Sequence, residues 1–356
     1  MPIEHTEIAS ALPSPAALAA RLPRSPAASA TVERGRRALR DALHGKDPRF
    51  VAIVGPCSIH DPVAALDYAR GLARLALAVG DVLTLVMRTY FEKPRSALGW
   101  KGLINDPHLD GSSDLALGVT RAREILCAVN ELGVPCASEI LDPIVRHYVG
   151  DLLAWACIGA RTSESQIHRE MASGLPMPVG VKNPTSGELA HAVDALVAAR
   201  SPHRHLGVGA NGGFVRVETS GNPDVHLVLR GGASGPNFGG ADVARASELV
   251  APLALARPIL IDCSHGNSGK DPERQPAVLR AVLAQFDAPE TPLLGAMLES
   301  HLQPGRQSLH AKAAPAYGVS LTDACLGWDT TEALLREAAG RLRSKPRARP
   351  SSMARC

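Results

Sequence analysis

The sequence predicts an α/β protein whose architecture is a TIM (β/α)8 barrel. The first observation is a set of short runs that are nearly continuous in apolar residues, as parallel strands covered on both faces are. The runs lie at 50–56, 82–88, 134–140, 156–161, 178–183, 225–231, 258–264 and 293–299. The second is that helix-like stretches, such as 62–80 and 115–133, separate the runs. Eight strand-then-helix units are typical of this barrel, and a doubly wound open sheet is the structural alternative.

Three segments depart from this rhythm. Residues 1–48 form an N-terminal extension, punctuated by prolines up to residue 31 and followed by a helix-like segment at 31–45 that ends on a glycine. A β-hairpin is expected as an insertion at 206–219, because Asn211-Gly212 supplies the positive φ angles of a tight turn. The barrel is predicted to span 49–340, and the basic, Pro/Ser-rich segment 341–356 is predicted to be a disordered tail.

Composition limits the classes of function. The chain has 356 residues, of which 45% are hydrophobic and 21% charged, with a formal net charge of +3. This charge is too small to indicate a nucleic-acid or membrane partner, and no apolar run is long enough to span a bilayer. The seven cysteines are an odd number without a CxxC pair. That pattern favours a reducing compartment, so the cytoplasm is the predicted location.

Chemically capable side chains follow the predicted strands, where barrel enzymes place catalytic groups. In chain order they are Cys57, Arg88, Glu139, Arg161, Lys182, Arg230, His265 and Glu299. Four of them are cations, and Lys93 and Arg95 add two more. Because Arg and Lys bind phosphate and carboxylate groups, this set predicts two phosphorylated substrates, or one that also carries a carboxylate. A surface network of salt bridges is the alternative, weakened because these strand ends offer few acids.

The remaining groups are of metal-ligand types. Cys57, His265 and Glu299 combine a thiol, an imidazole and a carboxylate, and Asp323 in "GVSLTDACLGW" adds a second carboxylate. A mixed set of this kind suits a divalent transition ion better than magnesium. Taken singly, a buried thiol or a capping histidine is the simpler interpretation of each residue.

Longer motifs carry a resemblance to a known family. The stretches are "GPCSIHDP", "MRTYFEKPRSALGWKGLINDP", "GARTSESQIHREMASGLP", "VGVKN", "LRGG", "DCSHGNS", "ESHLQPGRQS" and "YGVSLTDACLGW". From about Leu12 to about Leu335 the chain resembles the type I 3-deoxy-D-arabino-heptulosonate 7-phosphate (DAHP) synthases of the larger, feedback-regulated subtype. The resemblance implies a metal-dependent (β/α)8 enzyme. Its reaction is the condensation of phosphoenolpyruvate with D-erythrose 4-phosphate and water to DAHP and phosphate, the first step of the shikimate pathway.

The resemblance also implies a role for each matching residue. Cys57, His265, Glu299 and Asp323 match the ligands of one divalent ion, which is Mn2+, Fe2+, Co2+ or Zn2+. Arg88, Lys93, Arg161, Lys182 and Arg230 match the phosphoenolpyruvate-binding residues, and Arg95, Ser96 and Asp323 match the erythrose 4-phosphate site. Lys93 is the expected proton donor and Glu139 is expected to position a water, beside the catalytic ligands Cys57 and His265.

Three other functions are weighed against this one. A 3-deoxy-D-manno-octulosonate 8-phosphate synthase uses the same chemistry on arabinose 5-phosphate, but that family usually carries "KANRS" where this chain has "KPRS". A Schiff-base aldolase using Lys182 or Lys93 needs a desolvated lysine of low pKa. A regulatory barrel that only binds a phosphorylated metabolite has no need of four metal ligands.

Regulation is the last expectation that the resemblance supplies. It implies a homodimer or homotetramer and an aromatic amino acid effector, bound with the help of the N-terminal extension and the hairpin. His147, Pro176 and His205 stand where Gln, Ser and Phe are expected for phenylalanine sensitivity. The sequence therefore predicts altered or lost inhibition.

Overall fold

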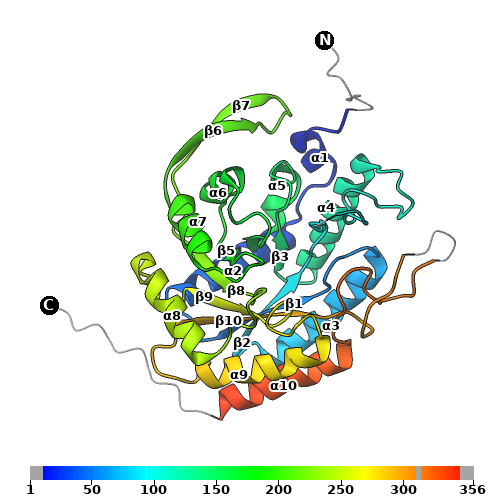
Figure 1. The fold of residues 1–356 in the computed structure, drawn as a ribbon. Helices are drawn as coiled ribbons and strands as arrows, with labels where there is room; N and C mark the ends of the chain where they lie inside the picture. The colour runs from blue at the N-terminus through cyan, green and yellow to red at the C-terminus, as the bar shows by residue number, and fades with distance from the viewer. Residues whose placement is uncertain (1–10, 96, 310–313, 345–356) are drawn as a thin grey trace.

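A closed barrel of parallel strands forms the centre of the molecule (Figure 1). The computed structural model describes residues 11–95, 97–309 and 314–344. The barrel strands are β1 Phe50–Gly55, β2 Leu83–Arg88, β3 Cys136–Glu139, β4 Trp155–Ile158, β5 Val179–Lys182, β8 Val225–Leu229, β9 Ile259–Asp262 and β10 Leu293–Glu299. Each of the eight predicted runs overlaps one of these strands. The predicted barrel is confirmed, and the open sheet is wrong because every barrel strand pairs with two neighbours and the last strand, β10, pairs with the first, β1.

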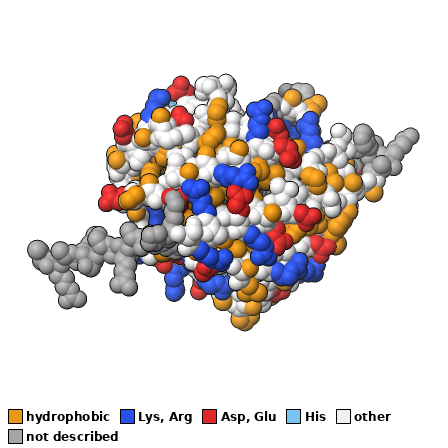
Figure 2. All heavy atoms as spheres, turned by 90° about the horizontal axis from the view of Figure 1, so that it is seen from below, with side chains coloured by type: hydrophobic (Ala, Val, Ile, Leu, Met, Phe, Trp, Pro, Cys, Tyr) orange, Lys and Arg blue, Asp and Glu red, His pale blue; other side chains and the backbone are white. Residues whose placement is uncertain are grey.

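Helices follow the strands and enclose the barrel (Figure 1). They are α3 Pro62–Val79, α4 Leu115–Glu131, α5 Arg146–Val149, α6 Gln166–Ser173, α7 Ala190–Arg200, α8 Gly240–Val250, α9 Gln275–Phe286 and α10 Trp328–Arg343, with 3-10 turns at Gly150–Leu152, Ala251–Leu253 and Pro272–Arg274. Within the described part of the chain, no helix combines the length and the apolar character needed to cross a membrane. Charged side chains of both signs are interspersed over the face drawn in Figure 2.

Alternate residues of one strand enter two different cores, which explains the continuous apolar runs. In β1, Ala52 and Val54 belong to the cluster shared with the surrounding helices. Val51 and Ile53 belong to a second cluster inside the barrel, together with Trp155 from β4. Because neither face of the strand meets water, every position is apolar.

Two helices precede the barrel, α1 Pro15–Arg21 and α2 Pro26–Leu43. The helix predicted at 31–45 therefore begins five residues earlier, and α1 was not predicted. The reason is that proline is well tolerated in the first turn of a helix. Ser25 accepts a hydrogen bond from the Ala28 amide at 3.2 Å, and Ser14 caps α1 in the same way. Leu39 and Leu43 of α2 pack with the interior cluster, so α2 closes the end of the barrel where the strands begin.

The inserted hairpin is also present, and it projects away from the barrel beside α1 (Figure 1). Its strands, β6 His203–Val208 and β7 Phe214–Thr219, pair antiparallel, so the first strand begins three residues before the predicted boundary. The loop is closed by a hydrogen bond from the Gly209 amide to the Gly213 carbonyl at 2.8 Å. Gly212 has a positive φ of 86° but Asn211 does not, so the turn is longer than the two-residue turn expected. At the other end of the chain α10 continues to Arg343, and residues 345–356 of the predicted tail lie outside the described residues.

Candidate active site

A cavity of about 920 Å3 lies at the end of the barrel where the strands finish. Its lining includes all six cations that the sequence predicted, which are Arg88, Lys93, Arg95, Arg161, Lys182 and Arg230. Lys270 and Arg274 from the loop after β9 also line it. Ser96, which was predicted beside Arg95, lies outside the described residues. The fold thus brings the predicted cations from the ends of β2, β4, β5 and β8, and from the loop after β2, to one cavity.

Arg88 lies at the floor of this cavity and is completely buried. Its Nη2 donates to Glu299 Oε1 at 3.0 Å, and its guanidinium stacks over the Tyr90 ring at 3.9 Å from the centroid. Burial alone lowers the pKa of Arg88, but Tyr90 and Glu299 outweigh it and raise the pKa. Arg88 is therefore a fixed cation held by a carboxylate and an aromatic ring.

Lys182 is held by a buried acid as well. Its Nζ donates to Asp262 Oδ2 at 2.9 Å, and both side chains are buried. Burial raises the pKa of Asp262, but Lys182 and His265 hold it well below its usual range. The expectation that the strand ends offer few acids is thus wrong for Arg88 and Lys182. Their partners point into the barrel rather than outward, so these are not surface salt bridges.

Three of the four predicted metal ligands form one compact group. The ligand atoms of Cys57, Glu299 and Asp323 all lie within 4.8 Å of one another. Asp323 Oδ2 is 3.7 Å from Cys57 Sγ. Beside the group is a cavity of about 10 Å3 whose lining includes His265, Glu299 and Asp323. A thiol and two carboxylates this close together are compatible with a single divalent metal ion.

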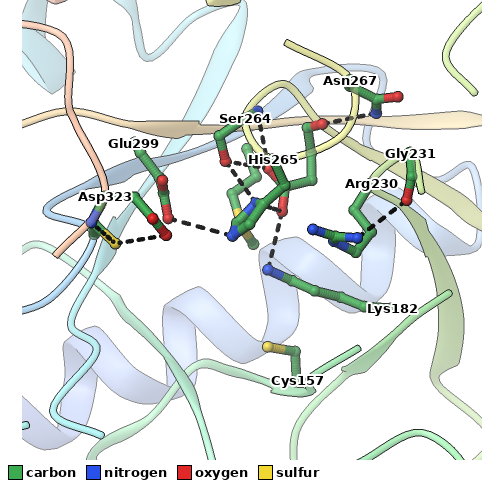
Figure 3. A network of polar contacts seen from close by, with 12 residues as sticks. Cys157, Lys182, Arg230, Gly231, Ser264, His265, Asn267, Glu299 and Asp323 are labelled. Carbon is green, nitrogen blue, oxygen red and sulfur yellow. Dashed lines mark hydrogen bonds and ion pairs between the residues drawn. The ribbon is translucent and has the colours of Figure 1, made fainter. Parts of the chain in front are cut away.

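His265, the fourth predicted ligand, lies next to this group rather than within it. Its Nε2 is 3.7 Å from Glu299 Oε1, a contact drawn in Figure 3. Its Nδ1 is 3.0 Å from Asp262 Oδ2. The backbone of His265 has a φ of 57°, a left-handed conformation that is costly for a residue with a Cβ. This strained loop directs the imidazole toward Glu299.

Lys93 connects the cationic part of the site with the thiol. Its Nζ lies 3.0 Å from Cys57 Sγ and 3.3 Å from the Cys57 carbonyl. Burial and Glu299 raise the pKa of the Cys57 thiol to about 11, although Lys93 opposes them. Burial lowers the pKa of Lys93, but Cys57, Glu299 and Asp323 outweigh it and raise the pKa. Lys93 is therefore a buried ammonium with three proton donors in the site.

Glu139 lines the cavity and is buried at the end of β3. Its Oε1 has no hydrogen-bond partner among the described residues. A Cβ added to Gly159 would lie 2.1 Å from this oxygen, so any larger residue at this position would displace the carboxylate. An unpartnered buried acceptor of this kind has capacity to bind a water or a substrate hydroxyl.

Tyr90, Asp262 and Lys270 are among the residues of this site that were missed from the sequence. Tyr90 lies under Arg88, Asp262 pairs with Lys182 and Lys270 lines the cavity. Asp262 carries a usable signal, because it ends the apolar run "PILID" as Glu299 ends "LLGAMLE". Lys270 carries a weaker one, because it lies in the same loop as His265. Tyr90 has none, since an aromatic residue after a strand is ordinarily part of a core.

A second cavity, of about 710 Å3, lies between the N-terminal helix α1 and the hairpin. Its lining includes His147 and Pro176, two of the three positions where the sequence departs from the expected pattern. The third, His205, lines a smaller neighbouring cavity of about 270 Å3 together with His147. The three positions are thus brought to one side of the molecule, away from the strand ends.

Comparison with known proteins places the chain among relatives along nearly its whole length. Residues 25–336 match the model of the DAHP synthetase I family. The chain is 50% identical over 327 residues to the phospho-2-dehydro-3-deoxyheptonate aldolase, Tyr-sensitive, of Escherichia coli (strain K12), covering 92% of both chains. It is 47% identical over 339 residues to the Phe-sensitive enzyme of the same organism, covering 95% of this chain and 96% of the relative.

A solved structure agrees with these relatives. The phospho-2-dehydro-3-deoxyheptonate aldolase from Francisella tularensis SCHU S4 superposes with a TM-score of 0.92 at 39% identity, covering 95% of this chain and 99% of that chain. The matches extend across the barrel, the hairpin and both clusters of site residues. The chain therefore belongs to the DAHP synthetase I family.

Proposed function

We propose that the chain is a 3-deoxy-7-phosphoheptulonate synthase, which condenses phosphoenolpyruvate with D-erythrose 4-phosphate and releases phosphate. The observation that supports it best is the lining of one cavity by six cations beside a thiol–carboxylate group. Two phosphorylated substrates, one of them also a carboxylate, carry negative charge that matches this cationic lining. The direct test is phosphate release by the purified chain with both substrates and a panel of divalent metals. Release with arabinose 5-phosphate in place of erythrose 4-phosphate would instead favour the octulosonate enzyme.

The residues divide between the two substrates. Arg88, Arg161, Lys182 and Arg230 bind the phosphate and carboxylate of phosphoenolpyruvate, while Arg95 and Ser96 bind the phosphate of erythrose 4-phosphate. Holding both substrates in the cavity brings C3 of phosphoenolpyruvate against the aldehyde carbon, which turns a two-molecule encounter into an oriented one. Carbon–carbon bond formation, addition of water at C2 and cleavage of the C2–O bond then give the product and phosphate.

Cys57, His265, Glu299 and Asp323 are the proposed ligands of one divalent ion, Mn2+, Fe2+, Co2+ or Zn2+. When bound, such an ion supplies Lewis-acid polarisation of an oxygen in the site. Lys93, an ammonium 3.0 Å from Cys57 Sγ, donates the proton that the aldehyde oxygen takes up as it becomes a hydroxyl. Glu139 accepts a hydrogen bond from the water that adds at C2 and holds it against the substrate.

A Schiff-base aldolase is disfavoured by the surroundings of both lysines. Lys182 donates to the buried carboxylate of Asp262 at 2.9 Å, and the pKa of Lys93 is raised rather than lowered. A Schiff-base nucleophile must be a neutral amine, which needs the opposite environment. Borohydride added with substrate is expected to leave the mass of the chain unchanged, whereas a stable adduct at Lys93 or Lys182 would contradict the metal-dependent route.

The division between substrates predicts opposite effects at two exposed arginines. Arg95→Ala is expected to raise the KM for erythrose 4-phosphate, and Arg161→Ala the KM for phosphoenolpyruvate. A hydrogen bond to a charged group contributes about 1.5–3 kcal/mol, which corresponds to roughly 10–150-fold in KM. Steady-state kinetics with each substrate varied in turn measures both constants. Equal changes in the two KM values for either variant would contradict the division.

The role of Glu139 predicts that a small change at Gly159 slows the chemistry. In Gly159→Ala the new methyl group would meet Glu139 Oε1 and displace the carboxylate. A misplacement of this order is expected to lower kcat by about 10–100-fold. The matched control is Gly340→Ala in α10, where the added Cβ meets nothing within 4 Å. An unchanged kcat in Gly159→Ala would remove Glu139 from the mechanism.

Regulation and assembly complete the proposal. The relatives described above are named Tyr-sensitive and Phe-sensitive. We place an aromatic amino acid effector in the cavity of about 710 Å3, with sensitivity altered by His147, Pro176 and His205. A homodimer or homotetramer in the cytoplasm is the proposed form, in keeping with the free thiols of the six cysteines that the structure describes. Assays with phenylalanine, tyrosine and tryptophan, and sedimentation of the purified chain, test these two points.

A further inference from the structure

One carboxylate, that of Asp262, contacts both parts of the proposed site. Asp262 is completely buried at the end of β9. Its Oδ2 lies 2.9 Å from Lys182 Nζ and 3.0 Å from His265 Nδ1. Its Oδ1 accepts hydrogen bonds from the Ser264 amide at 3.0 Å and the Ser264 hydroxyl at 2.6 Å. Oδ2 thus contacts both Lys182, one of the six cations of the large cavity, and His265, which lies beside the thiol–carboxylate group.

These contacts determine which ring nitrogen of His265 carries the proton. An ionised carboxylate only accepts hydrogen bonds, so the proton of a neutral His265 must lie on Nδ1. The hydroxyl of Ser264, 2.8 Å from Nδ1, has already given its hydrogen to Asp262 and is an acceptor there too. The lone pair of the imidazole is therefore on Nε2, which lies 3.7 Å from Glu299 Oε1. A carboxylate behind a histidine in this way fixes the tautomer and makes the other nitrogen a better metal ligand.

We propose that Asp262 is a positioning residue that couples substrate binding at Lys182 to metal binding at His265. The inference rests on the function proposed above, in which Lys182 binds phosphoenolpyruvate and His265 ligates the metal. An anionic substrate group at Lys182 competes with Asp262 for the ammonium. As the Lys182–Asp262 contact weakens, the hydrogen bond that Oδ2 accepts from His265 Nδ1 becomes stronger. His265 Nε2 then becomes a stronger electron-pair donor to a metal. Phosphoenolpyruvate then tightens metal binding, and by thermodynamic reciprocity the metal tightens phosphoenolpyruvate binding by the same factor.

The experiment measures the affinity of the full-length chain for Mn2+ with and without phosphoenolpyruvate, by the electron paramagnetic resonance of free Mn2+ with correction for Mn2+ bound by the free ligand. Asp262→Asn keeps the size of the side chain and removes its charge. We expect Asp262→Asn to weaken Mn2+ binding by about 10–100-fold, the usual effect of losing such a partner. We also expect the factor by which phosphoenolpyruvate changes the Mn2+ affinity to fall toward one. The KM for phosphoenolpyruvate should rise more than that for erythrose 4-phosphate.

Asp224→Asn is the matched control. Asp224 is also a buried carboxylate shared by two partners, Arg40 Nε at 2.7 Å and His44 Nε2 at 3.0 Å, but it precedes β8 at the opposite end of the barrel. This variant is expected to lose stability while it keeps the unaltered Mn2+ affinity and the unaltered response to phosphoenolpyruvate. An equal loss of Mn2+ affinity in both variants would mean a general structural effect and would overturn the proposal.

The remaining outcomes separate this inference from the proposed function. If the unaltered chain releases phosphate while Asp262→Asn keeps both its Mn2+ affinity and its response to phosphoenolpyruvate, the coupling role is wrong and the proposed function stands. If the unaltered chain releases no phosphate with any metal, the proposed function itself is wrong. Should Asp262→Asn fail to fold, Ser264→Ala removes one hydrogen bond to Asp262 and one contact to His265. A smaller loss of Mn2+ affinity is expected there, and no loss would overturn the proposal.

Discussion

Treatment with a chelator is expected to abolish phosphate release, and Mn2+, Co2+, Fe2+ or Zn2+ added afterwards is expected to restore it. Cys57→Ser is expected to reduce metal affinity by at least about tenfold, because a hydroxyl is a harder and weaker ligand than a thiolate. The geometry behind this expectation is the group formed by Cys57, Glu299 and Asp323, whose ligand atoms lie within 4.8 Å of one another. The measurement is metal content and activity of each protein after dialysis against chelator and after addition of each metal.

Proton release gives this prediction a second readout. The pKa of the Cys57 thiol is raised to about 11 by burial and Glu299, so at neutral pH the thiol carries a proton that the metal must displace. Metal affinity of the unaltered chain should therefore rise as pH increases from 6 to 8. The slope should be smaller in Cys57→Ser, whose hydroxyl keeps its proton. Cys127→Ser is the control, because Cys127 is a partly buried cysteine of α4 outside the site. Full activity of the unaltered chain in chelator would contradict the metal dependence.

The barrel could be predicted because burial on both faces leaves a strong signal. Val51 and Ile53 fill the interior while Ala52 and Val54 contact the helices, so β1 is a continuous apolar run in the sequence. The other barrel strands are buried as well and are mostly apolar. Four of the predicted cations followed from the same reasoning, since each lies at or just after a strand end, and Lys93 and Arg95 came from the basic stretch after β2. The N-terminal helices were harder, because the segment up to residue 31 was described only as punctuated by prolines, although Pro15 and Pro26 each begin a helix.

The partners of the buried cations could not be predicted, because they depend on register across the barrel. Arg88 of β2 reaches Glu299 of β10 past β1, and Lys182 of β5 reaches Asp262 of β9 past β8. In a barrel, alternate strands supply one interior layer, so each pair joins two strands of the same layer. A list of strand ends contains these residues but does not say which of them lie at the same height. Loop geometry is hidden in the same way, since nothing in "DCSHGNS" reveals the positive φ of His265.

Replacing Arg88 is expected to have a large effect on both stability and substrate binding. Arg88→Met keeps a long apolar side chain but leaves Glu299, which is only 1% exposed, without the guanidinium at 3.0 Å. Removing one member of a buried ion pair costs about 3–5 kcal/mol, because the remaining charge stays buried without compensation. The free energy of unfolding of the metal-free chain, measured by chemical denaturation, should fall by about that amount. The loss should be smaller with metal bound, since a cation at Glu299 would replace the missing charge.

Two further variants separate the parts of this effect. Arg123→Met removes another buried arginine, which donates to Asp151 at 2.7 and 3.0 Å, and it should destabilise the fold while leaving the KM for phosphoenolpyruvate unchanged. Arg88→Met should raise that KM as well, because the guanidinium lines the cavity proposed to bind phosphoenolpyruvate. In the double variant Arg88→Met/Glu299→Gln the orphaned charge is gone, so part of the stability should return without the activity. If the double variant were no more stable than Arg88→Met, the destabilisation would come from lost packing over Tyr90 rather than from an unpaired Glu299.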